Sequence, residues 1–253
     1  MFGQHCLQPA FRFDTFYGVD GCRAGWFFVG IGPEDETRFG VMKNIAELTE
    51  TKKRNSLFLV DIPIGLPSAE HPTRFCDTEA RRLLRPLRHN SVFSPPCRAA
   101  LLAESFREAC RINRNIVGKM ISQQAYHIGG KIRETDELLQ RKPELTSIIR
   151  EIHPEICFHS MAGGSPMRHN KRSAEGFTER LTLIQTYRSD AETIVRNSLE
   201  RFSRREVKPD DILDAMAAAV IGKISRGFLQ TLPENPEKDE NGLPMEIVRV
   251  FPA

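Results

Sequence analysis

The sequence lacks the features that define several classes of protein. No apolar run approaches the roughly 20 residues of a membrane-spanning helix. The opening residues, MFGQHCLQPAFRFDTF, do not follow the basic-then-apolar pattern of a signal peptide. The six cysteines form no CxxC pair, which argues against a structural zinc site, and their scatter is typical of reduced thiols. We therefore expect a cytoplasmic protein with no membrane partner.

An excess of charge is also lacking. Lysine and arginine number 36 against 33 aspartates and glutamates, so the formal net charge is only +3. This balance does not indicate a nucleic-acid binder, although a local basic groove would be averaged away in it. There is one tryptophan, Trp26, which we assign to the core. The 253 residues, 40% hydrophobic and 27% charged, are those of an ordinary globular protein.

The first part of the chain predicts an α/β sheet. YGVDGCRAGWFFVGIG predicts a β-hairpin, TRFGVMK predicts a third antiparallel strand, and NIAELTETKKR predicts an amphipathic helix with Asn44 as its N-cap. The apolar run from Leu57 to Val60 is typical of a central parallel strand. The single helix supplies the crossover that a parallel return requires.

The later part of the chain predicts mainly helices. A helical insertion is expected at about residues 70–145, and TSIIREIHPEICFHSMAG then predicts a further strand. Three more helices are expected in GFTERLTLIQTYR, DAETIVRNSLERF and DDILDAMAAAVIGKI. PENPEKDENGLP predicts an exposed loop, and MEIVRVF predicts an edge strand or tail. We expect residues 1–16 to be an N-terminal extension and residues 17–253 to be a single domain.

Acidic residues recur where the predicted elements begin or end. Asp20, Asp61 and Glu155 follow the apolar parts of predicted strands, and Asp211 and Asp214 share one face at the start of the last long helix. Open α/β folds bind ligands at the carboxyl ends of their parallel strands. Carboxylates gathered there would raise each other's pKa, and a pair of divalent cations would remove that penalty and support phosphodiester cleavage.

Three of these acids have a structural alternative that the sequence leaves open. Asp20 precedes Gly21, and Asp-Gly is a common hairpin turn. Asp211 would serve as the N-cap of its helix, and Glu155 as a solvated residue at a strand end.

Asp61 and Asp214 are harder to explain structurally. Four apolar residues precede Asp61, and no turn is signalled before Gly65. Asp214 lies one turn inside its helix and is followed by AMAAAV, whose small side chains allow close packing against a sheet. An acid on that side of the helix faces the protein.

A second set of residues predicts contacts with a substrate. Basic side chains would hold the phosphates of a nucleic acid, although a solvated helix face is the alternative for such a run. These residues are Arg81, Arg82, Arg85, Arg88 and His89, with Arg98, Lys131, Lys171 and Arg172 further along. His153 would orient a ligand or transfer a proton, or it would be a structural histidine at a strand end. Gln123 and Gln124 would hydrogen-bond a substrate.

The motifs occur in an order that resembles a known family. They are GVDGCRAGW, DIPIGLP, CDTEARRLLR, SVFSPPCRAAL, SQQ, KIRETD, EIHPEICF and DDILDAMAAA. Together they are similar to domain-of-unknown-function family 429, which is grouped with predicted nucleases of the ribonuclease H-like superfamily. The resemblance covers the chain from Tyr17 to Gly227.

The resemblance implies a ribonuclease H-like core, which is a five-stranded mixed sheet with three antiparallel strands followed by parallel ones and flanked by helices. It implies that Asp20, Asp61 and Asp214 hold Mg²⁺ or Mn²⁺, with Asp211 as an additional acid and Glu155 in the HPE motif of the family. It also implies a nuclease whose partner is nucleic acid or another phosphodiester.

Two further functions remain open. A non-catalytic ribonuclease H-like scaffold would bind nucleic acid or a protein and need no divalent ion. A phosphoryl transferase of the actin-like or sugar-kinase type is the third, but those proteins repeat their domain, and only one unit fits in 253 residues. The sequence does not indicate the oligomeric state.

Overall fold

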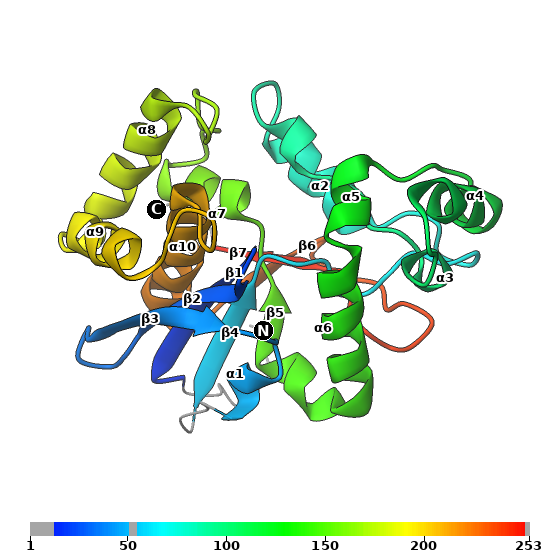
Figure 1. Cartoon of the computed structure of the whole chain (residues 1–253), viewed down its shortest axis with the longest axis horizontal. Helices are drawn as coiled ribbons and strands as arrows, with labels where there is room; N and C mark the ends of the chain where they lie inside the picture. The colour runs from blue at the N-terminus through cyan, green and yellow to red at the C-terminus, as the bar shows by residue number, and fades with distance from the viewer. Residues whose placement is uncertain (1–12, 51–54, 251–253) are drawn as a thin grey trace, which may run out of the picture.

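The computed structural model of the chain describes residues 13–50 and 55–250, which form a mixed β-sheet with helices on both faces (Figure 1). The strands of this sheet are β1 (Thr15–Cys22), β2 (Gly25–Ile31), β3 (Thr37–Met42), β4 (Ser56–Val60) and β5 (Ile149–Glu151). Their order is β3-β2-β1-β4-β5. The β1–β2 and β2–β3 pairs are antiparallel, whereas β1–β4 and β4–β5 are parallel. The predicted α/β class, with antiparallel strands followed by parallel ones, is therefore confirmed.

One face of the sheet is covered by α7 (Pro154–Met161), α8 (Ala174–Gln185), α9 (Ala191–Arg201) and α10 (Pro209–Ser225). The α10 backbone lies directly on β1 at Gly18. A Cβ atom built on Gly18 would be 1.9 Å from the carbonyl oxygen of Ala215 and 2.4 Å from the backbone nitrogen of Ala219. The small side chains of AMAAAV allow this approach, as the sequence predicts.

The other face is covered by α1 (Glu47–Glu50) and α6 (Gly129–Arg141). Ile132 and Leu139 of α6 pack in one cluster with Val19 and Trp26. Thus α6, which lies inside the predicted insertion, is part of the central core. Asn44 accepts a hydrogen bond from the backbone of Glu47, as expected of an N-cap, and residues 51–54 of the predicted helix lie outside the described residues.

Of the remaining helices between β4 and α6, the first packs against α7 and the later ones form a smaller lobe. In chain order, these helices are α2 (Phe75–Leu83), the 3-10 turn η1 (His89–Ser91), α3 (Arg98–Leu101), α4 (Phe106–Val117) and α5 (Gln123–His127). A second 3-10 turn, η2 (Pro143–Ser147), leads into β5. The lobe has its own apolar cluster, formed by α3, α4 and α5. Within the parts of the chain that are described, no helix is long and apolar enough to cross a membrane.

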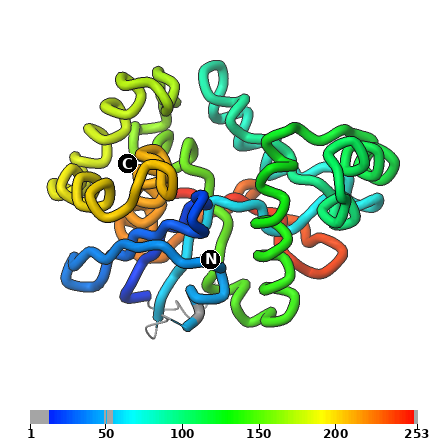
Figure 2. Tube along the Cα trace, in the orientation of Figure 1, coloured from blue at the N-terminus to red at the C-terminus, as the bar shows by residue number. Residues whose placement is uncertain are grey.

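The end of the chain forms a second sheet. β6 (Gln230–Leu232) pairs antiparallel with β7 (Ile247–Arg249), and a bridge between Ile152 and Val248 joins β7 to the segment after β5. The predicted strand in MEIVRVF is therefore present, but outside the main sheet. The C-terminal segment lies beside the segment that follows β4, where Asp239 accepts a hydrogen bond from Leu66 (Figure 2).

Two predicted boundaries are wrong. The strand predicted in TSIIREIHPEICFHSMAG ends at Glu151, and α7 begins at Pro154 because His153 caps it and proline favours the first helical position. β1 begins at Thr15, so residues 15 and 16 belong to the sheet and not to an extension, and residues 1–12 lie outside the described residues. The loop predicted in PENPEKDENGLP is exposed over most of its length, but Asp239 and Leu243 within it are buried.

Candidate functional site

The register of the two central strands places Asp20 and Asp61 side by side. Val19 and Val60 are partners in the parallel pair of β1 and β4, and each acid is the next residue along its strand. The backbone N–H of Asp61 donates to the carbonyl of Val19 at 2.8 Å. The β1–β2 turn begins after Cys22, so Asp20 lies within its strand and not in a turn.

A third acid reaches the same place from α10. Asp214 directly precedes Ala215, whose carbonyl lies against Gly18 of β1, and its side chain is 1% exposed. Asp20 and Asp61 each have a raised pKa to which Asp214 contributes by charge repulsion. Acids from the first strand, from the end of the fourth strand and from the last long helix therefore lie close enough to affect one another by charge.

These carboxyl groups are electrostatically unfavourable neighbours. Burial raises the pKa of Asp20 well above its ordinary value, and repulsion by Asp61 and Asp214 adds to the effect. Burial and the charge of Asp214 raise the pKa of Asp61 to about 7. Burial likewise raises the pKa of Asp214, although Lys171 opposes the shift. Without a cation, the cluster therefore retains protons near neutral pH.

Much of this charge has no partner in the protein. Among the described residues, the carboxyl groups of Asp20 and Asp61 make no hydrogen bond or ion pair, and Asp20 is only 8% exposed. The Oδ1 atom of Asp214 is buried without a hydrogen-bond partner. A buried carboxylate is costly unless it is paired. Such orphaned oxygens are what a hard cation would satisfy.

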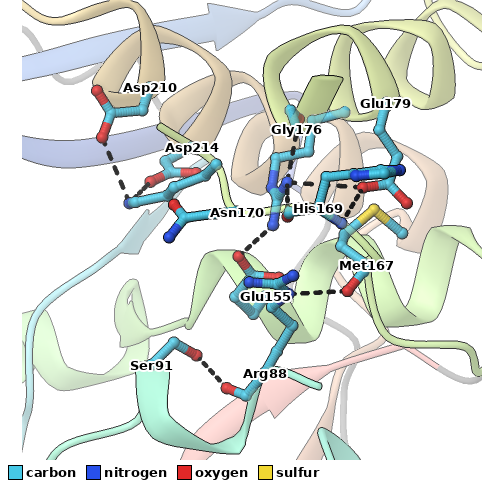
Figure 3. A network of polar contacts seen from close by, with 12 residues as sticks. Arg88, Ser91, Glu155, Met167, His169, Asn170, Gly176, Glu179, Asp210 and Asp214 are labelled. Carbon is cyan, nitrogen blue, oxygen red and sulfur yellow. Dashed lines mark hydrogen bonds and ion pairs between the residues drawn. The ribbon is translucent and has the colours of Figure 1, made fainter. Parts of the chain in front are cut away.

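One cation is supplied by the chain itself. Lys171, in the segment between α7 and α8, places its Nζ 2.5 Å from Oδ2 of Asp214 and 3.9 Å from Oδ2 of Asp210 (Figure 3). Burial lowers the pKa of Lys171, but the attraction of Asp214 and Asp20 outweighs it and holds the pKa above its ordinary range. Lys171 is therefore charged and neutralises one carboxylate.

Glu155 lies in a helix and forms an ion pair, whereas the sequence predicts it at the end of a strand. It occupies the first turn of α7, not a strand end, and its Oε1 accepts from Nη2 of Arg180 at 2.5 Å. Arg180, on α8, is 1% exposed, so this is a buried ion pair that commits one oxygen of Glu155. The sequence reasoning missed Arg180. Its only signal is a basic residue among the apolar positions of GFTERLTLIQ.

Two predicted roles are corrected by local geometry. His153 is the N-cap of α7: its Nδ1 accepts from the backbone of Glu155 at 3.2 Å, and burial lowers its pKa to about 4. It is therefore neutral at pH 7, and its capping contact fits the structural alternative that the sequence left open. Asp211 is not the N-cap of α10, which is Lys208. Asp211 lies three residues later and accepts from the Lys208 backbone at 2.9 Å.

A cavity of about 850 Å³ opens over the acids. The predicted residues that line it are Asp20, Asp61, Arg88, Gln124, Lys131, His153, Glu155, Lys171, Arg172 and Asp211, whereas Gln123 does not. Asp214 lies beneath this lining. Lys131 donates to the carbonyl of Gly25 at 2.5 Å, and its Nζ lies 4.5 Å from the centre of the Trp26 ring.

Three predicted substrate-binding arginines lie away from this cavity. Arg98 forms ion pairs with Asp136, Asp239 and Glu240, and these pairs commit its guanidinium to structure. Arg81 donates to the carbonyl of Val92 and the hydroxyl of Ser94, each at 2.9 Å. Arg85 is exposed beyond the end of α2. The sequence has no means of showing these partners, because each pairing depends on the fold.

The chemistry of the acids fits a hard divalent cation, with one reservation that comes from Lys171. Carboxylate oxygens are the ligands that Mg²⁺ and Mn²⁺ prefer, and Asp20, Asp61 and Oδ1 of Asp214 lack partners. However, no three His, Cys, Asp or Glu side chains in residues 13–50 and 55–250 form a ready ligand group. Lys171 already holds the other oxygen of Asp214.

Comparison with known proteins gives a family without an activity. Residues 18–238 match the profile of the family described as "Protein of unknown function (DUF429)". Neither the curated proteins nor the solved structures contain a match.

Proposed function

This chain belongs to the family of proteins of unknown function DUF429, and we propose that it is a divalent-metal-dependent phosphodiesterase that acts on nucleic acid. We propose with it a ribonuclease H-like fold. The order of three antiparallel strands followed by parallel ones supports this fold, as does the helix that delivers Asp214 to the central strand.

One observation carries the proposal: the neighbouring carboxyl groups of Asp20 and Asp61 line a cavity without a protein partner in the described chain. A fold that needed these groups only for structure would pair them, because unpaired buried carboxyls cost several kcal/mol in the charged form (about 3–5 kcal/mol for a broken buried pair). The ionised form of these two carboxyl groups is stable only when a cation or a positively charged ligand binds beside them.

The residues that would hold the cation are Asp20, Asp61 and Asp214. When bound, a divalent ion would stabilise the negative charge that develops on a phosphate and lower the pKa of water for attack. The acids themselves act as ligands, since an aspartate bound to a cation is not free to accept a proton. The chain's own contribution is to hold these three oxygen donors together at the end of β1 and β4.

Basic residues around the same cavity would hold the substrate by its phosphates. Arg88, Lys131, Arg172 and Lys208 line it together with Lys171. Arg172 and Lys208 are exposed, so they are positioned to meet a chain of phosphates that extends beyond the acids. A cavity that combines such a rim with buried acids favours a charged phosphodiester over an apolar ligand.

The proposal is tested by Asp20→Asn, which keeps the shape of the side chain and removes its charge. Cleavage of single-stranded DNA, duplex DNA, RNA and bis(4-nitrophenyl) phosphate would be measured in Mn²⁺ and in EDTA. We expect Mn²⁺-dependent cleavage by the wild type and a loss of at least about 100-fold in the variant, since outer-shell changes alone cost 10–100-fold. Glu144→Gln, an exposed acid of η2, is the matched control and keeps full activity. Undiminished cleavage by folded Asp20→Asn would refute the assignment.

A non-catalytic nucleic-acid scaffold is the second candidate, and the ion pair between Lys171 and Asp214 favours it. That pair already neutralises one acid without any metal. A scaffold would bind the same oligonucleotides equally well in EDTA and in Mn²⁺ and would cleave none of them. Filter binding beside the cleavage assay therefore separates the two candidates.

A further inference from the structure

The two oxygens of Asp214 have different surroundings. Oδ2 lies 2.5 Å from the ammonium of Lys171, whereas Oδ1 is buried without a hydrogen-bond partner. Asp20 and Asp61 are also unpartnered among the described residues. Asp214 is thus a carboxylate with a cation beside one oxygen and no partner at the other.

The segment that carries Lys171 is held firmly from α8. Glu179 accepts hydrogen bonds from the backbone of Arg168 at 2.8 Å and of His169 at 2.9 Å, and Figure 3 shows Glu179 beside His169. Arg180 donates to the carbonyl of His169 at 3.1 Å. These contacts fix the two residues just before the turn that delivers Lys171.

The same segment is held from the opposite side by Arg88. Its Nε donates to the carbonyl of Met167 at 2.8 Å, and its Nη2 donates to the carbonyl of Arg168. Lys171 is about one third exposed, yet its ammonium is directed to the most buried acid of the cluster. A lysine on a free surface loop would not be anchored in this way, so its position is part of the site.

The position of Lys171 limits how many ions can contact Asp214. Its ammonium lies 2.5 Å from Oδ2 of Asp214 and 3.9 Å from Oδ2 of Asp210, so it occupies the space beside both oxygens. Only Oδ1 of Asp214 is left for a further cation. A second divalent ion at Asp214 would have to displace Lys171 from Oδ2.

We propose that the site takes a single divalent cation, held by Asp20, Asp61 and Oδ1 of Asp214, and that the ammonium of Lys171 occupies the place of a second ion. This inference rests on the proposed function, since it concerns the same acids. It assigns Lys171 as a fixed positive charge of the site, and not as a general phosphate-binding residue.

The test is the number of Mn²⁺ ions bound, measured by isothermal titration calorimetry on the whole chain. We expect one ion per wild-type chain and two per Lys171→Gln chain. Lys119→Gln removes an exposed lysine that does not line the cavity and is the control that keeps one ion. Two ions in the wild type, or one ion of unchanged affinity in Lys171→Gln, would overturn the inference while leaving metal-dependent cleavage intact.

Two further measurements cover a variant that folds poorly. Lys171→Arg keeps the positive charge and is expected to bind one ion, and the electron paramagnetic resonance spectrum of Mn²⁺ in the wild type is expected to show an isolated ion. A spectrum of two coupled ions would contradict the inference without reference to any variant. Absence of Mn²⁺ binding to every chain would instead overturn the proposed function, and this inference with it.

Discussion

Arg74 lies between two buried carboxyl groups, and this arrangement leaves one negative charge uncompensated. It donates to Asp77 at 2.7 Å and to Glu151, and all three residues are at most 5% exposed. Glu151 also accepts from the backbone of Ile64 at 2.6 Å. Burial raises the pKa of Glu151 to about 8 in spite of Arg74, because Asp77 shares the same guanidinium. One proton on the pair restores neutrality.

This proton predicts a pH dependence of stability. The pKa of Glu151 is about 8 in the folded chain against an ordinary value of 4.5, so its contribution to stability is complete below pH 4.5 and is lost as the pH rises through 8. Glu151→Gln mimics the protonated form at every pH. Relative to this variant, the wild type should lose unfolding free energy with a slope of up to about 1.4 kcal/mol per pH unit in that window.

Urea unfolding in EDTA at several pH values measures the difference between the two chains. The exposed Glu144→Gln chain serves as the control and should follow the wild type. If the unfolding free energies of the wild type and Glu151→Gln changed with pH in the same way, Glu151 would be ionised throughout. Arg74 would then stabilise both carboxylates in their charged form.

At the scale of single residues, the sequence predicts the site only in part. Asp20 and Asp61 are predictable because each acid follows an apolar run at the end of a strand, and parallel strands bring such residues to one edge. Arg180 and the ion pair of Lys171 are not predictable, because each joins residues from separate elements. Arg98 shows the opposite error: the sequence predicts a substrate-binding residue, but ion pairs with three acids distant in the sequence neutralise its charge.

At the scale of elements, the contact between β1 and α10 places Asp214. The backbone of Gly18 meets the backbone of α10, and a Cβ atom there would lie 1.9 Å from the Ala215 carbonyl and 2.8 Å from Cβ of Ala218. Backbone atoms cannot move aside as a flexible side chain can. The spacing of helix and strand, and with it the position of Asp214, therefore depends on the absence of a side chain at residue 18.

Gly18→Ala should consequently destabilise the chain by about 3 kcal/mol, the upper part of the usual range for overpacking. It should also weaken Mn²⁺ binding, because α10 must shift and carries Asp214 with it. Gly130→Ala in α6 is the matched control: nothing lies within 4 Å of its Cβ position. There alanine is expected to be neutral or to stabilise the helix by up to about 1 kcal/mol. Urea unfolding compares the two; equal stabilities would show that α10 adjusts at no cost.

The elements also show where a sequence pattern was misread. The sheet order and the last long helix are predictable from apolar runs and small residues, but the strand predicted through Glu155 is wrong. His153, Pro154 and Glu155 are an N-cap, a proline at the first helical position and an acid in the first turn, which together signal the start of a helix. The apolar residues that follow fit a buried helix as well as a strand, so only these start signals distinguish the two.

At the scale of the whole molecule, the cavity lies where two parts of the chain meet. Helices α7 to α10 lie on one side of the sheet edge that carries Asp20 and Asp61, and α2 and the smaller lobe lie on the other (Figure 1). Arg88, beyond the end of α2, connects the two through the carbonyls of Met167 and Arg168. Met167 and Arg168 precede Lys171 by four and three residues. The hydrogen bonds of Arg88 therefore couple the relative position of the two parts to the position of the Lys171 ammonium.

Arg88→Gln should therefore loosen the Lys171 segment without unfolding the sheet. Each lost hydrogen bond is worth about 1 kcal/mol, so amide hydrogen exchange in residues 163–173 should become about tenfold faster. The amides of Arg168 and His169, which donate to Glu179, report this directly. Exchange in β1 and β4 should not change, and Arg82→Gln, an exposed arginine of α2, should leave both regions unchanged. If exchange in 163–173 stayed at the wild-type rate, the contacts from α8 alone would hold Lys171 in place. The part of the chain that carries Arg88 would then line the cavity without affecting the position of the Lys171 ammonium.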